Sequence, residues 1–382
     1  MILSIVAVLF TFGLVIFLHE LGHFLVCKLA KIKVEAFSFG FGPELFGRVK
    51  GDTRYSIRAI PLGGYVKPAG ENIEEVTGHP DEYFSKPWYT RLGVVLAGPF
   101  MNYMLAFILF TGVIFTVGKP VYLSVVGEVL AGKPAARAGL ESGDKVLSVD
   151  WVKVTTWDDM AALIYQKVEA NVLIEYERKG AAAKVKIKTS RGTNPETGKD
   201  IGLIGVALDQ SASVFQKVGT MDSVRFGAGQ CWFWTAYTVK TLASNLRRRE
   251  KPDISGPIGI VNIVSKAAHS GMPDLFFLIA LISVAVGFFN LLPIPLLDGG
   301  HAVMFILEGI FRRRVTPKVM GWLNSTGIAF IVFILLFATY SDIKRLVGVK
   351  IEPTPRPVAV HEGAKQFGIA DPAHAVPPAQ GK

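Results

Sequence analysis

An apolar run at the start of the chain continues directly into a polar pentad, and this junction constrains the fold more than any other feature. Residues 1–18 carry no charged side chain, and His19-Glu20-Leu21-Gly22-His23 follows them. The apolar character resumes at Phe24, so the whole segment is typical of a membrane span. Histidines four positions apart share one helical face and can hold one zinc ion, with the intervening glutamate as general base. The sequence therefore predicts a metal site on a transmembrane helix.

The competing interpretation treats residues 1–18 as a signal anchor and the pentad as its polar flank. No basic segment precedes the run and no small-residue cleavage site follows it, although a secretory signal would carry both. An ionisable residue at membrane depth costs roughly 2.5–3.5 kcal/mol on insertion scales, so three of them within five positions need a compensating partner such as a metal. These observations favour the metal site.

The bulk composition indicates an integral membrane protein with at least one soluble insert. Half of the residues are hydrophobic (50%), and the mean hydropathy is +0.38. The formal charge of +10 comes from lysines and arginines that cluster beside apolar runs, which indicates membrane topology rather than nucleic-acid binding. The expected partner is therefore the lipid bilayer and not a nucleic acid. Cys27 and Cys231 are too few for a disulfide framework.

Four segments are long and apolar enough to span a membrane or nearly so. Basic residues follow the first of them and none precede it, which places the amino terminus outside and the following loop in the cytoplasm. A basic triplet at 312–314 marks a second cytoplasmic loop. We therefore expect a polytopic α-helical membrane protein with both termini outside. The segments are Ile2–Val26, Leu92–Val117, Leu275–Leu297 and Trp322–Ala338.

The external insert, from Lys119 to about Ser213, alternates short β-type runs with Gly/Pro turns and contains one helical stretch, Trp157–Lys167. This pattern predicts a small α+β domain. Residues 133–150 resemble the PDZ signature of bacterial envelope proteases, and PDZ domains bind extended peptide segments at a sheet edge. Trp151 stands where that signature often has glycine, so we expect an altered turn there. An unrelated small β domain is the alternative.

The segment Met221–Leu246 is amphipathic, rich in aromatic residues, and followed by arginines. It contains Arg225, Gln230 and Lys240, which argue against a fifth span and favour a helix in the membrane interface. From Glu352 onward the chain is rich in Pro and Ala, which is typical of a disordered tail.

A catalytic zinc site needs a third protein ligand, and the sequence offers two candidates. Cys27 lies on the same helical face, but about 12 Å along the axis from His19, so one metal cannot bind both histidines and this cysteine. Asp298 ends the third apolar segment, where Pro293 and Pro295 break the helix and open the backbone at membrane depth. A lone aspartate at a helix end is more often a cap. Its coincidence with a broken helix favours the ligand.

The chain resembles the bacterial site-2 protease family of intramembrane zinc metalloproteases, in its RseP-like branch, over about Met1–Val347. One departure is the insert, which has room for a single PDZ domain where the best-known members carry two. The motifs that carry the resemblance are His19–His23, Phe39–Pro43, Tyr55–Gly70, Ala97-Gly98-Pro99 with Asn102, Ser255–Ile258, and the N-x-x-P-x-P-x-x-D-G-G-H stretch from Asn290 to His301.

The resemblance implies one Zn²⁺ per chain, with His19, His23 and Asp298 as its ligands and Glu20 as general base. It also implies that Asn290 holds substrate near the metal, the alternative being a polar contact between helices. His301 stays outside the expected catalytic set.

The segment Tyr55–Gly70 resembles the family's membrane re-entrant β-loop, which can offer a sheet edge to an unwound substrate. The expected substrate-binding residues in this loop are Tyr55, Ser56, Ile57, Gly63 and Gly64.

The resemblance implies a zinc metalloendopeptidase of the bacterial inner membrane, multi-pass, with its active site towards the cytoplasm and its PDZ domain in the periplasm. Its substrates would be single-pass membrane proteins, such as anti-sigma factors, and remnant signal peptides. A catalytically silent, membrane-anchored PDZ adaptor is the alternative, and a transporter with broken helices is a third, although no internal repeat supports it.

The expected organisation assigns a role to each stretch of the chain. The boundaries are 1–27 for the first transmembrane helix, 28–91 for the cytoplasmic-side segment with the β-loop, 92–117 for the second transmembrane helix, 118–213 for the PDZ domain, 214–274 for the linker with an interfacial helix, 275–311 for the third transmembrane helix and the helix after it, 312–321 for a cytoplasmic loop, 322–347 for the fourth transmembrane helix, and 348–382 for the disordered tail.

Overall fold

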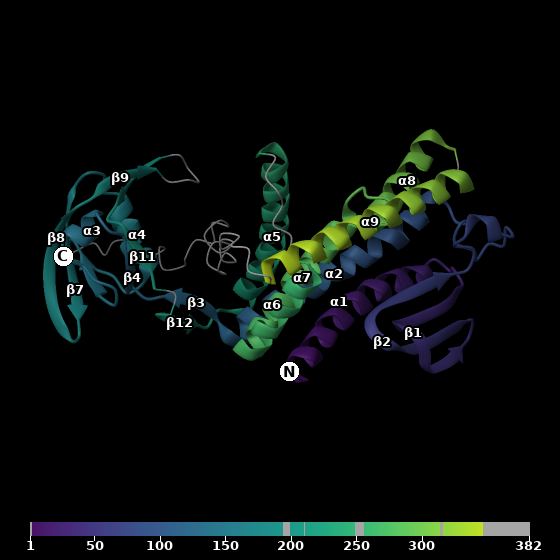
Figure 1. Ribbon diagram of the computed structural model, residues 1–382, viewed down its shortest axis with the longest axis horizontal. Helices are drawn as coiled ribbons and strands as arrows, with labels where there is room; N and C mark the ends of the chain where they lie inside the picture. The colour runs from purple at the N-terminus through teal and green to yellow at the C-terminus, as the bar shows by residue number, and fades with distance from the viewer. Residues whose placement is uncertain (1, 194–198, 210, 249–255, 314–315, 347–382) are drawn as a thin grey trace, which may run out of the picture. The chain divides into compact units, whose positions relative to one another are not determined.

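The computed structural model describes residues 2–193, 199–209, 211–248, 256–313 and 316–346 (Figure 1). The predicted disordered tail, Ser255 and Arg314 lie outside the described residues. The chain divides into two compact units, one formed by Met1–Phe115 with Gly219–Lys382 and the other by Thr116–Val218. The second unit begins two residues before the PDZ domain predicted at 118–213 and ends five residues after it.

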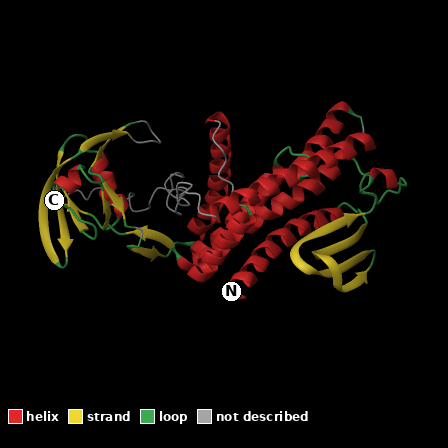
Figure 2. Ribbon diagram, viewed as in Figure 1, coloured by secondary structure: helices red, strands yellow, loops and turns green. Residues whose placement is uncertain are grey.

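The first unit is a helical bundle with one β-hairpin (Figure 2). Within the described residues, four helices are long and apolar enough to cross a membrane: α1, α2, α7 and the stretch Pro317–Asp342 of α9. The helices are α1 (Ile2–Leu29), α2 (Trp88–Val117), α5 (Thr220–Arg248), α6 (Pro257–Ser270), α7 (Met272–Leu291), α8 (Asp298–Phe311) and α9 (Pro317–Leu346), with a short 3₁₀ turn η1 (Ile73–Glu75).

The helix α7 ends at Leu291, six residues earlier than the apolar run in the sequence. Pro293 and Pro295 follow directly and cannot donate backbone hydrogen bonds, so the chain leaves the helix although it stays apolar. A new helix, α8, then begins at Asp298. The break therefore lies inside the apolar run and separates two helices.

The helices α1 and α2 make a close backbone contact. A Cβ atom added at Gly22 would lie 2.3 Å from the carbonyl oxygen of Ala97, so this position of α1 accepts only glycine without a shift. Small residues that let helix backbones approach are typical of packing within membranes. Nearer the start of α1, buried Ala7 and Val15 pack in a cluster with residues of α6 and α7. The helix α1 thus packs against α2 at the pentad and against α6 and α7 nearer its start.

The hairpin consists of β1 (Val34–Lys50) and β2 (Thr53–Pro68), and each strand folds back on itself. Residues 54–57 pair with 36–39 on one side and with 46–49 on the other. Residues 36–39 pair on their second side with 64–67. The result is a four-segment sheet in which 64–67 forms an edge. Tyr55, Ser56 and Ile57 are paired on both sides, so the expectation that they offer a free edge to substrate is wrong.

The helix α5 contains the amphipathic segment predicted from the sequence, but its first half packs against the bundle. The Tyr103 hydroxyl of α2 lies 2.9 Å from the Thr235 hydroxyl, and Cys231 and Trp234 pack against a buried cluster that includes Phe110. These contacts are not apparent from the local sequence pattern. Amphipathicity alone does not distinguish a helix that faces lipid headgroups from one that faces other helices.

The second unit is an α+β fold around one apolar core, with a four-stranded antiparallel sheet in the order β6-β5-β7-β8. The β-type runs of the sequence correspond to β4, β5, β7, β8 and the pair β10/β11. Its elements are β3 (Lys119–Tyr122), β4 (Val126–Val129), α3 (Pro134–Arg137), β5 (Lys145–Val149), β6 (Val152–Lys153), α4 (Trp157–Tyr165), β7 (Asn171–Arg178), β8 (Ala181–Lys188), β9 (Ser190–Thr193), β10 (Asp200–Leu203), β11 (Val206–Leu208) and β12 (Ser213–Gln216).

Trp151 stands in a tight turn between β5 and β6. Asp150 and Trp151 have φ of 47° and 69° and join β5 to β6 as a two-residue turn. Positive φ at both central residues is what a tight hairpin turn of this kind requires, and glycine usually supplies it. The Lys184 ammonium nitrogen lies over the Trp151 ring, 4.4 Å from the ring centroid. This cation–π contact helps to offset the cost of the positive φ at Trp151.

Arg178 fixes the loop before β5, and this contact predicts a pH dependence of the second unit. Its guanidinium donates to both carboxylate oxygens of Asp144, at 2.7 Å each. Burial alone would raise the pKa of Asp144, but the bonds from Arg178 and from the Glu141 N–H lower it below its ordinary value. A lowered pKa gives stability that is present above the unfolded value, about 3.9, and is lost as the pH falls through the folded value.

We therefore expect the protection of this loop from hydrogen exchange, measured against the intrinsic rate at each pH, to fall below about pH 4 in the wild type, and much less so in Asp144→Asn. The Asp144→Asn protein should already exchange faster at pH 6. Its side-chain carboxamide has one acceptor oxygen and one NH₂ group, so it cannot accept both hydrogen bonds from Arg178. Equal acid sensitivity of the two proteins would show that another carboxyl group controls this loop.

Candidate metal centre

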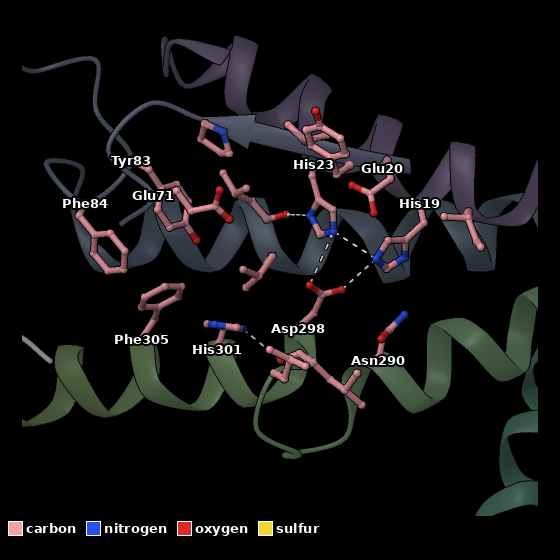
Figure 3. A pocket seen from close by; sticks show the side chains of 18 of the residues that line it. His19, Glu20, His23, Glu71, Tyr83, Phe84, Asn290, Asp298, His301 and Phe305 are labelled. Atoms are coloured by element: carbon pink, nitrogen blue, oxygen red, sulfur yellow. Dashed lines mark hydrogen bonds and ion pairs between the residues drawn. The ribbon is translucent and has the colours of Figure 1, made fainter. Parts of the chain in front are cut away.

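His19 and His23 lie one turn apart on α1 and point to the same side of the helix (Figure 3). Their Nε2 atoms are 3.2 Å apart. Both side chains are largely buried, with 11% and 14% of their surface exposed. The i, i+4 spacing of the pentad produces this arrangement directly, so two potential donor atoms face one point.

Asp298 reaches the same point from α8. It is the first residue of that helix, directly after the proline-containing loop that ends α7. The loop is tight, since a Cβ atom at Gly299 would lie 2.3 Å from the carbonyl oxygen of Leu291. One carboxylate oxygen lies 3.1 Å from His19 Nε2 and the other lies 3.6 Å from His23 Nε2. The three residues thus form a potential metal-binding group, with donor atoms within 4.8 Å of one another.

The spacing of these atoms fits a zinc ion. Zinc–ligand bonds of about 2.0–2.1 Å in a tetrahedron place neighbouring ligand atoms about 3.3 Å apart. The three measured separations are 3.1, 3.2 and 3.6 Å. Asp298 Oδ2 is buried and has no hydrogen-bond partner among the described residues, which is costly unless a cation satisfies it. Two imidazoles and one carboxylate are a typical donor set for a catalytic zinc site.

Residues of α2 contact the Nδ1 atoms of both imidazole rings. His23 Nδ1–H donates to the carbonyl oxygen of Val94 at 2.8 Å, which leaves the Nε2 lone pair free. The amide nitrogen of Asn102 lies 3.1 Å from His19 Nδ1, while its buried Oδ1 has no partner among the described residues. Amide oxygen and nitrogen can be exchanged by a half turn of the group. After that half turn, Asn102 Oδ1 accepts a hydrogen bond from His19 Nδ1–H. The Nε2 lone pair of His19 is then also free to bind a metal.

Gly98 brings α2 into direct contact with the two rings. A Cβ atom at this position would lie 2.4 Å from His23 Nε2 and 2.7 Å from His19 Cε1. The site therefore has room for the rings only because this residue has no side chain.

Glu20 lies beside the potential ligands and next to the edge of the sheet. Its carboxylate accepts a hydrogen bond from the backbone N–H of Val66, and a Cβ atom at Gly64 would lie 3.5 Å from its Cγ. The glutamate is thus oriented by the edge segment 64–67, and not by the doubly paired segment that contains Ile57.

A cavity of about 530 Å³ joins these groups. Asn290 at the end of α7 and His301 on α8 both line it, as do Tyr65 and Val66 of the sheet edge. Figure 3 shows Asn290 and His301 near Asp298, on the side opposite the α1 histidines. Of the substrate-binding residues predicted in the loop, Tyr55, Ser56 and Ile57 instead line a separate apolar pocket with phenylalanines.

Cys27 takes no part in the group. Its side chain is fully buried in an apolar cluster with Ile32, Val34 and Tyr83. A free cysteine in such surroundings behaves as a small apolar residue, as the sequence analysis expected.

Three contributions of α2 were missed by reasoning from the sequence: the Val94 carbonyl, the Gly98 contact and the Asn102 amide. The motif Gly98-Pro99 with Asn102 was noted only for its resemblance. Asn102 could have been found from the sequence, because it is a polar residue four positions after a glycine on an apolar helix. A polar residue in such a helix needs a partner within the bundle.

Replacing Asn102 with leucine is expected to weaken zinc binding by about 10- to 100-fold, because His19 loses the acceptor that fixes its ring and tautomer. Asn102→Asp, which keeps an acceptor at this position, should bind close to wild type. Competition with a chromophoric chelator measures both affinities. Unchanged binding by the leucine variant would mean that the amide does not orient His19.

Comparison with known proteins agrees with this centre. The family model for peptidase family M50 matches residues 7–334. A protein named "Putative zinc metalloprotease" from Clostridium acetobutylicum is 32% identical over 345 residues, covering 89% of this chain and 97% of its own. Proteins of the same name from Rhizobium meliloti and Campylobacter jejuni are each 32% identical, covering 89% and 91% of this chain and 96% and 95% of their own.

Among solved structures, the PDZ domain of the SdrC-like protein from Listeria monocytogenes covers 25% of this chain and 90% of its own, with 23% identity and a TM-score of 0.19. The family match runs over residues 7–334, a range that contains both the pentad and Asp298. The chain is a membrane protein and belongs to peptidase family M50.

Proposed function

We propose that this protein is a zinc-dependent endopeptidase that cleaves single-pass membrane proteins, such as anti-sigma factors and remnant signal peptides, within the membrane. The observation that carries the proposal is the meeting of His19, His23 and Asp298, from two helices, at zinc-like separations beside Glu20. Membership of a peptidase family supports hydrolysis as the reaction.

The side chains have separable roles in this reaction. His19, His23 and Asp298 would hold the zinc, which when bound polarises the scissile carbonyl and makes a nearby water more acidic. Glu20 would accept the proton of the attacking water and pass it to the nitrogen of the leaving amine. Its bond from the Val66 N–H fixes the carboxylate for both transfers. Asn290 lines the opposite wall of the cavity and can donate to the substrate backbone or to the developing oxyanion.

The edge segment 64–67 supplies a site for the unwound substrate. A transmembrane helix satisfies its own peptide groups, so it must open before attack, and an extended strand can then pair with a sheet edge. This edge lines the same cavity as Glu20. Tyr65 and Val66 of this edge line the cavity, and the substrate-binding role of Gly63 and Gly64 stays a prediction.

The distribution of basic residues supports an orientation in the bacterial inner membrane with the centre towards the cytoplasm and the second unit in the periplasm. In that location the second unit would act as a single PDZ domain and bind or exclude peptide segments of the substrate's external part.

Reconstitution with a labelled single-span substrate tests the proposal. Wild-type protein in liposomes should cleave it, a zinc chelator should stop cleavage, and added zinc should restore it. Asp298→Ala should not cleave at any zinc concentration that leaves the liposomes intact. Cleavage that survives both chelation and Asp298→Ala would overturn the zinc-protease proposal.

A further inference from the structure

The position of Asp298 depends on how α8 is held, because this ligand stands at the first residue of a short helix. The helix buries only one stripe of side chains, and its other residues are half-buried or exposed. The buried residues are Gly299, Ala302 and Phe305, and the exposed apolar ones are Val303, Ile306, Leu307, Ile310 and Phe311. A helix with one buried stripe can slide along its axis unless a specific contact prevents it.

Arg91 makes such a contact from the first turn of α2. Only 2% of its side chain is exposed, and it donates to the carboxylate of Glu308 on α8 and, through Nε at 3.1 Å, to the carbonyl oxygen of Lys86. Its guanidinium carbon lies 5.1 Å from the ring centroid of Phe84 and 4.6 Å from that of Phe305. The guanidinium plane is thus fixed by two rings and two acceptors.

A buried ion pair often contributes little net stability, so its presence is better explained by another role. Apolar residues of the same volume are often as stable, because the charges must be removed from water, whereas loss of one partner leaves a buried charge unpaired. Such a pair can instead fix one register between the two elements that carry it. Near the pair, a Cβ atom at Gly309 would lie 2.5 Å from the Trp88 ring, so the same stretch of α8 also fits closely against the start of α2.

The pair connects α8 to the helix that already orients the two histidines. Val94 and Asn102 of α2 hold His23 and His19, and Arg91 precedes Val94 by one turn. Asp298 and Glu308 are ten residues apart on α8, about 15 Å along one rigid helix. A slide of α8 by one turn would move Asp298 by about 5.4 Å, which is more than twice a zinc–oxygen bond.

We propose that Arg91 and Glu308 are positioning residues for the metal ligand Asp298. Their ion pair, held between Phe84 and Phe305, sets the axial position of α8 against α2 so that the carboxylate meets the two histidines. All three ligands then take their positions from α2. This inference rests on the proposed zinc function of the centre.

Cobalt binding by the purified full-length chain tests the inference without an activity assay, because tetrahedral Co²⁺ has visible absorption bands that report its geometry. We expect Glu308→Gln and Arg91→Met each to weaken Co²⁺ binding by about tenfold or more, with altered band intensity. The double variant should be no weaker than the poorer single variant, because the two side chains act as one unit. At saturating zinc the kcat of Glu308→Gln should recover, while the substrate KM stays unchanged.

Phe110→Leu is the matched control for lost stability, since Phe110 is buried in a different cluster of the same unit. It should lower the unfolding midpoint and leave Co²⁺ affinity unchanged. Arg91→Lys keeps the charge but cannot reach both acceptors and stack between two rings. It should bind Co²⁺ with intermediate affinity, and it replaces Arg91→Met if that variant does not fold.

Asp298→Ala, measured in parallel, separates the two proposals. If Asp298→Ala loses Co²⁺ binding while the Arg91 and Glu308 variants bind and absorb like wild type, the ion pair is purely structural and the positioning role is wrong. If Asp298→Ala itself binds like wild type, the proposed metal centre is wrong. Weakened binding in both sets, with Phe110→Leu unaffected, supports the inference.

Discussion

Replacing Glu20 with glutamine is expected to lower kcat by about 10²- to 10⁴-fold, the usual contribution of a general base. The amide keeps the size of the side chain and can still accept the Val66 N–H bond that orients it, but it cannot take a proton from water. Zinc content should stay at one ion per chain, because Glu20 is not part of the group formed by His19, His23 and Asp298. Single-turnover cleavage in liposomes and metal analysis of the same sample measure both quantities.

Glu71→Gln is the matched control for this experiment. Glu71 is a second glutamate that lines the same cavity, so its replacement changes the cavity charge equally without removing the group beside the ligands. We expect it to lower kcat by less than about tenfold, an effect below that of a general base. If Glu20→Gln retained wild-type kcat, or if both variants lost activity equally, Glu20 would not be the base.

Replacing Gly98 with alanine is expected to abolish zinc binding and cleavage together. The added methyl group would lie 2.4 Å from His23 Nε2, the atom that faces Asp298. The ring cannot move away freely, because its Nδ1–H is bonded to Val94. Nor can α1 retreat without losing its contact at Gly22. Overpacking of this size costs about 1–3 kcal/mol, so the protein should still fold while the donor atoms are displaced.

Gly93→Ala provides the control on the same helix. Nothing among the described residues lies within 4 Å of a Cβ atom placed there, so this variant should bind zinc and cleave like wild type. Metal analysis after purification, together with a thermal unfolding midpoint, distinguishes loss of the site from loss of the fold. A Gly98→Ala protein with a full complement of zinc would contradict the geometry described for this contact.

The sequence predicted the elements that depend on local chemistry. The apolar runs correspond to the four helices of the described residues that are long and apolar enough to span a membrane, because burial of a helix in lipid depends on about 20 consecutive residues and little else. The spacing of His19 and His23 placed both rings on one face. Two prolines after Leu291 predicted the broken helix that presents Asp298.

Predictions that depended on pairing partners were less accurate. The β-type pattern of Tyr55–Gly70 was recognised, but the edge was assigned to the whole segment, and the sheet pairs Tyr55, Ser56 and Ile57 on both sides. Alternation of side chains reports which face a residue takes and not which strands flank it. The amphipathic segment that forms α5 was assigned to the membrane interface for a similar reason, and part of it contacts helices instead.

By itself, the sequence determined that this chain is a membrane protein with four apolar segments long enough to span, a two-histidine helix, a break inside the third apolar segment and an inserted α+β unit. These features follow from hydrophobicity and from backbone chemistry within a few residues of each other. Only the tertiary structure decided that Asp298 meets the histidines, that Gly98 and Asn102 of α2 shape the site, and that the edge at Val66 faces Glu20. Those contacts join residues that are distant in the chain, and packing between whole elements, not local propensity, selects them.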